Sequence, residues 1–530
     1  MEEKRVRYPI GQQSFEVLRK GGFLYVDKTM YIDQIVNGSQ YYFLGRPRRF
    51  GKSLFLSTLK AFFEGKRELF RGLHADTMDW DWEPYPVIYI DLNNQRYQDQ
   101  EDYYDLNIVV DETLKTYEEK LGITAPEANL SARFALLIRR LSEAAGKGVV
   151  ILVDEYDKPL VNNINDHERF VQYRNKLSAL YSNFKSSAPY IRLVFLTGVS
   201  RFGKLSVFSG LNNISDISFI DEFAAICGIT EDELKMNFRS GIASLAEKYG
   251  RTPEEEIVKL KHHYDGYHFS EVCPDIYNPF SLLQVMAYRK YSNYWIASAN
   301  SSLLVEELQR VDADLMSLVH SRCAQSALEG LDIDGLSPMA LLFQTGYLTI
   351  KDYDEEDEIY TLGIPNEEVR EGFFEQLIPW YTSLTKDNTH VFIADLRKDL
   401  ERGEVDKFMH RLQSLFAGFG HDLQFDEERN VQNAMFLIFS IIGIKADAEV
   451  RTSDGSIDIL VRTSRYIYIM ELKYNRSAGE ALAQINEKEY ALPWSFDARK
   501  IIKIGINYSS AKRRIDDWKI EEQDSSILLS

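Results

Sequence analysis

The stretch YYFLGRPRRFGKSLFL, residues 41–56, decides how the front of the chain is expected to fold. It opens with an apolar run that predicts a buried strand, and it closes on apolar residues at helical spacing. The loop between them ends in Gly51, Lys52 and Ser53, an arrangement in which backbone N–H groups surround phosphate groups. In such a loop the amine of Lys52 reaches the β and γ phosphates, and the hydroxyl of Ser53 ligates Mg²⁺. The sequence therefore predicts a site for ATP and Mg²⁺ here.

The loop departs from the usual phosphate-loop pattern at one position. The pattern has a glycine where this chain has Arg46, and the glycine stands one residue earlier. A Gly-Lys-Ser tripeptide alone is expected by chance in about one of every few chains of this length. Arg46, Arg48 and Arg49 make the loop basic, which suits a polyphosphate, and Arg49 is a candidate ligand to it. The alternative is a basic surface loop that joins a strand to a helix.

A second motif lies at the end of another predicted strand. The continuous apolar run from Val149 to Val153 is typical of a central parallel strand, and Asp154 and Glu155 follow it directly. An acid at the carboxyl end of a strand beside a phosphate loop can hold Mg²⁺ through water, which is the role expected for Asp154. Glu155 is placed to polarise the attacking water. The alternative is a strand that ends in a solvated acidic turn.

A third strand is predicted over residues 191–197, and polar residues follow it. Thr197 or Ser200 is the candidate sensor of the γ-phosphate. Arg201 could stabilise transition-state charge within the chain, or across a subunit contact in a homo-oligomer. For any one of these residues an ordinary turn is the alternative. Because strands alternate with helical patterns, we expect an α/β fold with a doubly wound parallel sheet over about residues 20–220.

The rest of the chain is expected to be mainly helical before it returns to an α/β pattern. Thr230 and Thr252 begin helix-capping patterns, and residues 347–362 predict a hairpin with an acidic turn. The helical segment would serve as a lid and connector. We therefore expect three domains, over residues 1–220, 221–418 and 419–530.

The last predicted domain contains a candidate metal site. Asp458 begins one predicted strand, and Glu471 and Lys473 alternate on the next, so that both point to one face. Two carboxylates and an ammonium group at this spacing can hold Mg²⁺ or Mn²⁺, because these cations prefer oxygen ligands. The metal would polarise a phosphodiester, and Lys473 would orient or help to deprotonate a bound water. Lysines and arginines make this end locally basic. The alternative is a sheet edge with ordinary alternating charges.

The composition of the 530 residues is that of a globular protein, with 45% hydrophobic and 27% charged residues. A net charge of −19 argues against a protein that coats nucleic acid non-specifically, although it permits a local basic groove. Cys227, Cys273 and Cys323 lie far apart, which argues against a disulfide framework or zinc site. Since no apolar run approaches a membrane span and the N-terminus lacks a signal-peptide core, we expect a cytoplasmic protein without a membrane partner.

Several motifs together resemble one bacterial protein family. The segments RPRRFGKS, YVDKT, VILVDEYDKPL, TGVSRF, YDGYHF and YNPFSLL resemble the bacterial AAA-ATPase-like proteins. GSIDILV, YIYIMELKYN and ALAQI resemble the PD-(D/E)XK nuclease superfamily domain that is usually fused to them. The resemblance covers nearly the whole chain. It implies a P-loop NTPase module with Walker A and Walker B motifs, related to AAA and STAND switch ATPases, and a C-terminal restriction-endonuclease-like α/β domain.

The resemblance extends to individual residues of the C-terminal domain. Asp458, Glu471 and Lys473 match the nuclease core, Glu449 matches an upstream acid that would be a further metal ligand, and Gln484 matches the glutamine of the following helix. Relatives often carry Gly-Arg before the aspartate, and here Ser456 replaces the arginine. This exchange leaves the metal ligands intact and removes an expected contact to the substrate phosphate.

Three hypotheses follow for the function. In the first, ATP controls a metal-dependent nuclease that acts on nucleic acid, DNA rather than RNA. In the second, a nucleotide-dependent switch or interaction protein has a nuclease-like domain that binds without cutting, which the net charge and Ser456 favour. In the third, the protein is structural and both sites are vestigial. The first accounts for two phosphate-handling sites in one chain, and it is the one we expect.

Overall fold

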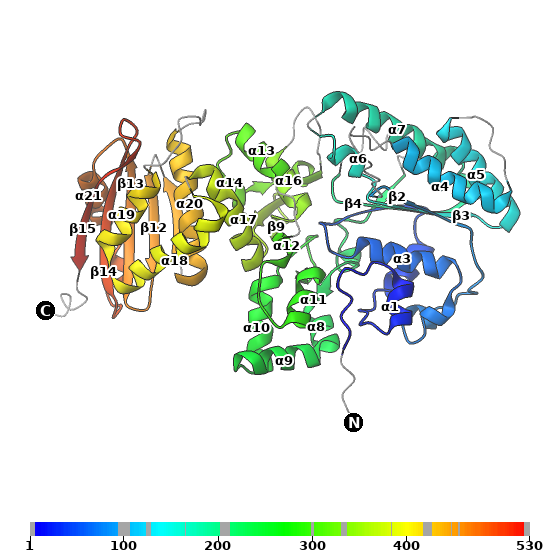
Figure 1. Ribbon diagram of the computed structural model, residues 1–530, viewed down its shortest axis with the longest axis horizontal. Helices are drawn as coiled ribbons and strands as arrows, with labels where there is room; N and C mark the ends of the chain where they lie inside the picture. Colours follow the sequence, from blue (N-terminus) through cyan, green and yellow to red (C-terminus); the bar gives the residue numbers. More distant parts are fainter. Residues whose placement is uncertain are drawn as a thin grey trace. The chain divides into compact units, whose positions relative to one another are not determined.

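The computed structural model shows a chain with two compact units (Figure 1). The first comprises Met1–Trp295 and Ser321–Asn366, and the second comprises Ile296–His320 and Glu367–Ser530. The three domains expected from the sequence remain a prediction. The described residues are 6–93, 106–122, 129–164, 166–201, 213–297, 302–329, 337–382, 384–416, 427–446, 448–453 and 456–523.

The first unit is built on a five-stranded sheet in the order β2-β3-β4-β1-β5. Every neighbouring pair is parallel, so the carboxyl ends of the strands lie along one edge of the sheet. The burial of all six residues of β3 is expected for a central strand covered on both faces. The strands are β1 (Tyr41–Gly45), β2 (Val87–Asp91), β3 (Val149–Asp154), β4 (Ile191–Gly198) and β5 (Ser215–Asp216).

Helices cover both faces of this sheet, which confirms the predicted doubly wound α/β core. On one face lie α1 (Phe15–Gly21) and α3 (Lys52–Phe63) (Figure 1). On the other lie α4 (Leu106–Leu121), α5 (Leu130–Ala145) and α7 (His167–Ser186) (Figure 1). The core also contains α2 (Met30–Asn37) and the short α6 (Lys158–Val161).

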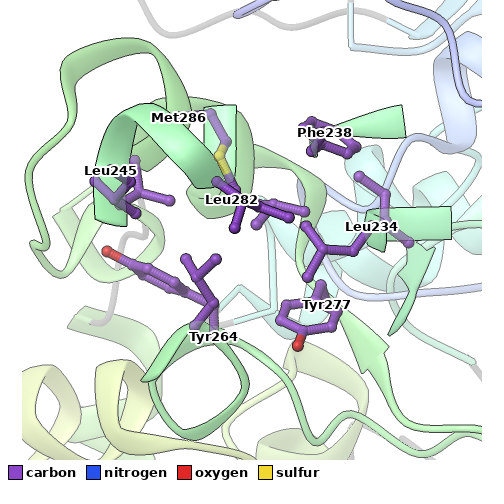
Figure 2. Packing of buried hydrophobic residues seen from close by; sticks show 11 residues of the cluster. Leu234, Phe238, Leu245, Tyr264, Tyr277, Leu282 and Met286 are labelled. Atoms are coloured by element: carbon purple, nitrogen blue, oxygen red, sulfur yellow. The ribbon is translucent and has the colours of Figure 1, made fainter. Parts of the chain in front are cut away.

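A helical segment follows the core within the first unit. Its helices α8 and α10 begin with the predicted capping boxes, in which the hydroxyls of Thr230 and Thr252 accept hydrogen bonds from backbone N–H groups. Figure 2 shows its apolar core, to which Leu234, Phe238, Leu245, Tyr264, Tyr277, Leu282 and Met286 belong. The elements are β6 (Ile229–Thr230), α8 (Glu231–Asn237), α9 (Arg239–Tyr249), α10 (Pro253–Tyr264), β7 (Ile276–Tyr277) and α11 (Pro279–Tyr288).

The remainder of the first unit includes a small antiparallel sheet in the order β8-β10-β9. The strands β9 and β10 form the predicted hairpin, with the acidic residues 355–358 at its turn. The elements are β8 (Arg322–Cys323), α15 (Ser326–Glu329), α16 (Pro338–Thr345), β9 (Thr349–Asp354) and β10 (Ile359–Gly363).

Asp265, directly after α10, gives a prediction about pH. Burial raises the pKa of this carboxyl from 3.8 to about 7, Asp275 adds to the rise, and Lys261 opposes it. The folded state therefore binds more protons than the unfolded chain between about pH 4 and 7, and this group makes unfolding easier as the pH rises through that range. In the wild type, this group should lower the free energy of unfolding by at most about 4 kcal/mol as the pH rises through that range. We expect this pH dependence to be absent from Asp265→Asn.

Chemical denaturation of the wild type and Asp265→Asn between pH 4.5 and 8 measures this difference. The variant should be the more stable protein at pH 8. Equal pH slopes for the two proteins would contradict the expectation.

The second unit joins a group of helices to a five-stranded sheet in the order β11-β12-β13-β14-β15. β13 and β14 are parallel, the other neighbours are antiparallel, and α21 makes the connection that the parallel pair requires. The helices are α13 (Ser302–Arg310), α14 (Leu315–Val319), α17 (Glu367–Tyr381), α18 (Lys386–Arg402), α19 (Val405–Phe416), α20 (Glu427–Ala446) and α21 (Ala478–Glu487). The strands are β11 (Ala448–Ser453), β12 (Ser456–Arg462), β13 (Tyr466–Tyr474), β14 (Lys500–Ser509) and β15 (Arg514–Gln523).

The two faces of this second sheet are covered by different helices. Ile467 and Ile469 of β13 pack in one apolar cluster with Ile485 of α21. The alternate residue Tyr468 points the other way, because its hydroxyl donates to the carbonyl of Leu400 in α18 at 2.6 Å. The period of two along a strand therefore directs the odd-numbered residues of β13 toward α21.

The short helix α12 (Tyr294–Ala297) contains the boundary between the two units, which lies between Trp295 and Ile296. None of the helices within the described ranges combines the length and apolar composition needed to cross a membrane.

Candidate functional site

The loop between β1 and α3 has the backbone that the phosphate-loop prediction requires. Gly51 has a φ of 103°, a left-handed conformation that residues with a Cβ rarely adopt. Arg49 also has a positive φ, of 71°. The chain then enters α3, so that Lys52 is its first residue and Ser53 its second. The N-terminus of α3 therefore faces the loop with backbone N–H groups that have no partner inside the helix.

The amine of Lys52 lies inside this loop. Its Nζ donates to the carbonyls of Arg46 at 2.8 Å and Pro47 at 3.1 Å, and the residue is 5% exposed. Burial lowers the pKa of Lys52, and the negative charges of Glu155 and Asp154 oppose that shift. The amine is thus buried and held by two neutral acceptors. Phosphate oxygens are stronger acceptors for an ammonium group, and they would compete with these carbonyls for it.

Asp154 is held at the carboxyl end of β3 by two hydroxyl groups. Thr197 Oγ1 donates to its Oδ1 at 2.6 Å, and the Tyr89 hydroxyl donates to its Oδ2 at 3.2 Å. The next residue, Glu155, has a φ of 50°, and its N–H donates to Asp154 Oδ1 at 3.1 Å. A left-handed glutamate is backbone strain of a kind that gathers at functional sites.

The strand order explains why these residues meet. β4 lies between β1 and β3, and Leu44 of β1 pairs with Thr197 while Val153 of β3 pairs with Leu196. The structure thereby brings Lys52, Asp154 and Thr197 to one edge of the sheet. Their functional roles remain predictions.

Removal of the Thr197 hydroxyl should slow nucleotide hydrolysis. The change Thr197→Val keeps the side-chain shape and deletes one bond to a carboxylate, which corresponds to about a 10-fold to 100-fold effect. We expect this loss in the rate of ATP hydrolysis at saturating Mg²⁺, with metal-free nucleotide affinity unchanged. Thr389→Val is the matched control, since Thr389 is also buried and its hydroxyl donates to the Thr385 carbonyl at the start of α18. Equal rates for the two variants would refute the role of Thr197.

Arg46 has a different place from the one expected of a basic loop residue. Its guanidinium is 2% exposed and donates to the carbonyls of Ser218, Phe223 and Ala224 at 2.8–3.2 Å. Burial lowers its pKa to about 10. Arg46 therefore anchors the loop to the segment that follows β5, and its guanidinium is engaged by these backbone carbonyls.

Arg49 and Arg201, which were predicted to contact the nucleotide, also have partners in the first unit. The guanidinium of Arg49 lies 4.9 Å from the ring centre of Phe280. Arg201 forms an ion pair with Asp216 at 2.8 Å, and its guanidinium lies 4.1 Å from the ring centre of Phe219. Neither of these contacts involves Lys52, and the roles of both arginines at a nucleotide remain predictions.

Two residues near the loop were missed by the sequence reasoning. One is Tyr89, whose hydroxyl donates a hydrogen bond to Asp154 that no sequence motif predicts. The other is Asp157, which is 2% exposed and accepts from the N–H groups of Val199 and Ser200 at 3.1 and 2.6 Å. Burial raises the pKa of Asp157. The repeated acid in Asp-Glu-Tyr-Asp was the available signal for this residue, which ties the end of β3 to the end of β4.

An apolar pocket lies beside the phosphate loop. Tyr25 and Val26 line it from before α2, Phe50 and Gly51 from the loop, and Phe238 from the end of α8. Lys28, which also lines the pocket, donates to the Ala225 carbonyl and forms an ion pair with Glu233, each at 2.7 Å. Because Phe50 and Gly51 belong to its lining, the pocket adjoins the loop that holds Lys52.

The second unit brings three of the predicted nuclease residues together. Glu471 and Lys473 lie on β13 and form an ion pair at 2.9 Å, with Glu471 fully buried. The amine of Lys473 also donates to Gln484 Oε1 of α21 at 2.6 Å. The amine is thus fixed between a carboxylate and an amide oxygen, on the face that α21 covers.

Asp458 and Glu449 are placed by their backbones. Asp458 of β12 pairs directly with Glu471 of β13, and Glu449 of β11 pairs with Leu460. Their side chains lie outside the described part of the structure. Among the described side chains there is no cluster of three or more histidine, cysteine, aspartate or glutamate residues that could hold a metal ion. The complete predicted metal site therefore remains a prediction.

The basic residues predicted at this end are largely ion-paired. Four of these pairs join Arg499 to Asp497, Lys500 to Glu522, Lys503 to Glu521 and Lys512 to Asp516. The positive charge seen in the sequence is therefore balanced locally by carboxylates.

Comparisons with known proteins agree with this architecture. A family model described as a predicted AAA-ATPase matches residues 9–208, and one described as the PD-(D/E)XK nuclease superfamily matches residues 426–518. A protein of Azotobacter chroococcum mcd 1, described as an uncharacterized protein in the vnfD 5′ region, is 33% identical over 536 residues. That similarity covers 98% of this chain and 99% of the relative.

Proposed function

Because the chain belongs to the AAA-ATPase-like family and ends in a PD-(D/E)XK nuclease superfamily domain, we propose that it is an ATPase that controls metal-dependent cleavage of DNA. The family membership confirms the resemblance predicted from the motifs. It supports a nucleotide-binding part and a nuclease-like part. Hydrolysis of ATP, the choice of DNA and the cleavage itself are what we add.

The observation that carries the proposal is the buried amine of Lys52 beside Asp154 and its partner Thr197. Lys52 would exchange the carbonyls of Arg46 and Pro47 for the β and γ phosphates of ATP. Bound Mg²⁺, held by Ser53 and Asp154, would neutralise charge that develops on the phosphates.

The other residues near Lys52 would bind and orient. Glu155 would orient the attacking water and accept its proton, while Thr197 keeps the Asp154 carboxylate directed at the site. The apolar pocket beside Gly51 would receive the adenine, because a flat ring of low polarity fits between Tyr25, Val26 and Phe238.

The second half of the proposal rests on Lys473, whose amine lies between Glu471 and Gln484. Carboxylates are the ligands that Mg²⁺ and Mn²⁺ prefer, and Glu471 with the paired Asp458 and the nearby Glu449 would hold one such ion. When bound, the ion would polarise a phosphodiester and supply a water of lowered pKa. Lys473 would orient that water, and Gln484 would keep the amine in place.

A cleavage panel tests the proposal. Supercoiled plasmid, linear duplex, single-stranded DNA and RNA are each incubated with the full chain, and Mg²⁺, Mn²⁺ and ATP are varied independently. We expect cleavage of DNA that requires the metal and changes with ATP, together with ATP hydrolysis. If no substrate is cut under any combination of metal and nucleotide, the nuclease half of the proposal fails. If ATP is not bound, the ATPase half fails.

A second candidate function is a nucleotide-dependent switch whose C-terminal part binds a partner without cutting. It is favoured by the ion pairs in which carboxylates of β15 balance the lysines of β14, and by Ser456 in place of the family's arginine. This alternative predicts slow ATP turnover and nucleotide-dependent assembly, measured by light scattering of the full chain. Rapid metal-dependent cleavage in the panel would exclude it.

A further inference from the structure

The ring of Phe50, the residue before Gly51, is held by an aromatic turn far away in the sequence. Its ring centre lies 4.8 Å from that of Tyr267 and 5.3 Å from that of Phe269, and both pairs are edge-to-face. Phe50 is 1% exposed, and its carbonyl accepts from the N–H of Gly228 at 3.0 Å. Both the side chain and the backbone of Phe50 are therefore fixed from outside the sheet.

The same turn also contacts the other end of the phosphate loop. The guanidinium of Arg46 lies 4.3 Å from the ring centre of Phe269, in addition to its bonds to backbone carbonyls. The two carbonyls that bond to Lys52 belong to Arg46 and its neighbour Pro47, so this contact lies at the acceptors of the lysine. At Arg48, between them, the carbonyl accepts from the Trp295 indole N–H at 3.1 Å. The loop is thus contacted at both ends, through Arg46 and Phe50, and near its middle, through Arg48.

The turn itself is rigidly attached to the first unit. The N–H of His268 donates to Thr349 Oγ1 at 2.7 Å, and that hydroxyl donates back to the His268 carbonyl at 2.9 Å. The side chain of Asn366 donates to the Asp265 carbonyl at 2.7 Å. Tyr267 pairs with Ile276 through two backbone hydrogen bonds. A turn anchored on both sides can impose a conformation on the loop that packs against it.

We propose that Tyr267 and Phe269 are positioning residues for nucleotide binding, which set the phosphate loop in its binding conformation without touching the nucleotide. This inference rests on the proposed ATP site. A glycine at position 46 would leave the loop conformationally free, and ordering it would weaken binding by that entropic cost. Here Arg46 and the aromatic turn order the loop in advance, so that binding does not bear that cost.

Variants of Tyr267 test the proposal. Tyr267→Leu removes the edge-to-face contact, and Tyr267→Phe keeps it. We expect Tyr267→Leu to weaken the binding of a fluorescent ATP analogue with Mg²⁺ about 10-fold, which is the scale of losing such aromatic contacts. Tyr267→Phe should bind like the wild type. Phe134→Leu is the matched control, because Phe134 is equally buried, pairs edge-to-face with Phe184 at 5.9 Å, and lies between α5 and α7.

The outcomes separate positioning from general stability. If Tyr267→Leu and Phe134→Leu lose the same stability in thermal unfolding and the same affinity, the positioning role is refuted. If the wild type binds no ATP, the proposed function fails, and hydrogen exchange of residues 46–52 then tests the inference without any nucleotide. Faster exchange of this segment in Tyr267→Leu than in Phe134→Leu supports the proposal, and equal exchange overturns it.

Discussion

Replacement of Lys52 by methionine is expected to weaken ATP binding by about 100-fold or more. The amine is buried at the start of α3 and directed into the loop, where it donates to the carbonyls of Arg46 and Pro47. Each charge-assisted hydrogen bond contributes about 1.5–3 kcal/mol, so the loss of two such bonds to phosphate corresponds to at least two orders of magnitude. Titration with a fluorescent ATP analogue in the presence of Mg²⁺ measures the loss.

The choice of methionine separates charge from packing. It keeps the length and apolar stem of Lys52, so the core around α3 should remain filled. Lys60→Met is the matched control on the same helix, because Lys60 is half-exposed and paired with Glu64 at 2.6 Å. We expect the control to bind ATP like the wild type, and both variants to unfold near the wild-type temperature. Wild-type affinity in folded Lys52→Met would remove the basis for an ATP site.

The parallel core could be predicted because its strands carry the signal locally. The run Val149–Val153 is apolar without interruption, as burial on both faces requires, and an acid marks its carboxyl end. The capping boxes at Thr230 and Thr252 are equally local, because each consists of residues within one helical turn. Such features depend on neighbours in sequence, and for that reason they can be read from the chain itself.

The role of Arg46 could not be predicted, because its partners are distant in sequence. The carbonyls of Ser218, Phe223 and Ala224, to which it donates, lie 172 to 178 positions away. In the sequence Arg46 is one of three basic residues in a loop, and electrostatics alone directs all three toward a phosphate. Only the fold shows that this arginine is buried. Where the usual phosphate-loop pattern has a flexible glycine, this chain has a packed side chain.

The two-unit arrangement was hidden for a similar reason. Residues 296–320 belong to the second unit, although they interrupt the sequence of the first. Asn433 of α20 shows why: its side chain accepts from the N–H of Leu315 and donates to the carbonyl of Ala313. The helical pattern of this segment predicts a helix, but it contains no information about the partner against which that helix packs.

The C-terminal site was predictable in part. The alternation of Glu471 and Lys473 predicts a shared face, and the observed ion pair at 2.9 Å agrees with it. The local basic charge, in contrast, was misleading, because Lys503 and other lysines pair with carboxylates of β15 that only the sheet pairing brings close. A count of charges along the chain does not show how many of them are neutralised.

Replacement of Lys473 is expected to remove metal-dependent DNA cleavage, with a rate loss of about 10²–10⁴-fold, the range for a group that orients water or transfers its proton. The amine is fixed by Glu471 at 2.9 Å and Gln484 at 2.6 Å. Removal of the amine alone would break the buried ion pair with Glu471, which costs about 3–5 kcal/mol of stability. The informative variant is therefore Lys473→Met combined with Glu471→Gln, which removes both charges and keeps both shapes.

The single change Glu471→Gln gives the complementary result. It removes a proposed metal ligand and leaves Lys473 bonded to Gln484, so cleavage should fall and the Mn²⁺ concentration required for half-maximal rate should rise. Lys503→Met is the matched control, because Lys503 is a buried lysine on the adjacent strand β14, paired with Glu521 at 2.9 Å. Conversion of supercoiled plasmid is measured for all variants at equal folded fraction. An undiminished rate in the double variant, or an equal loss in Lys503→Met, would show that the Glu471–Lys473 pair stabilises the sheet and takes no part in phosphodiester chemistry.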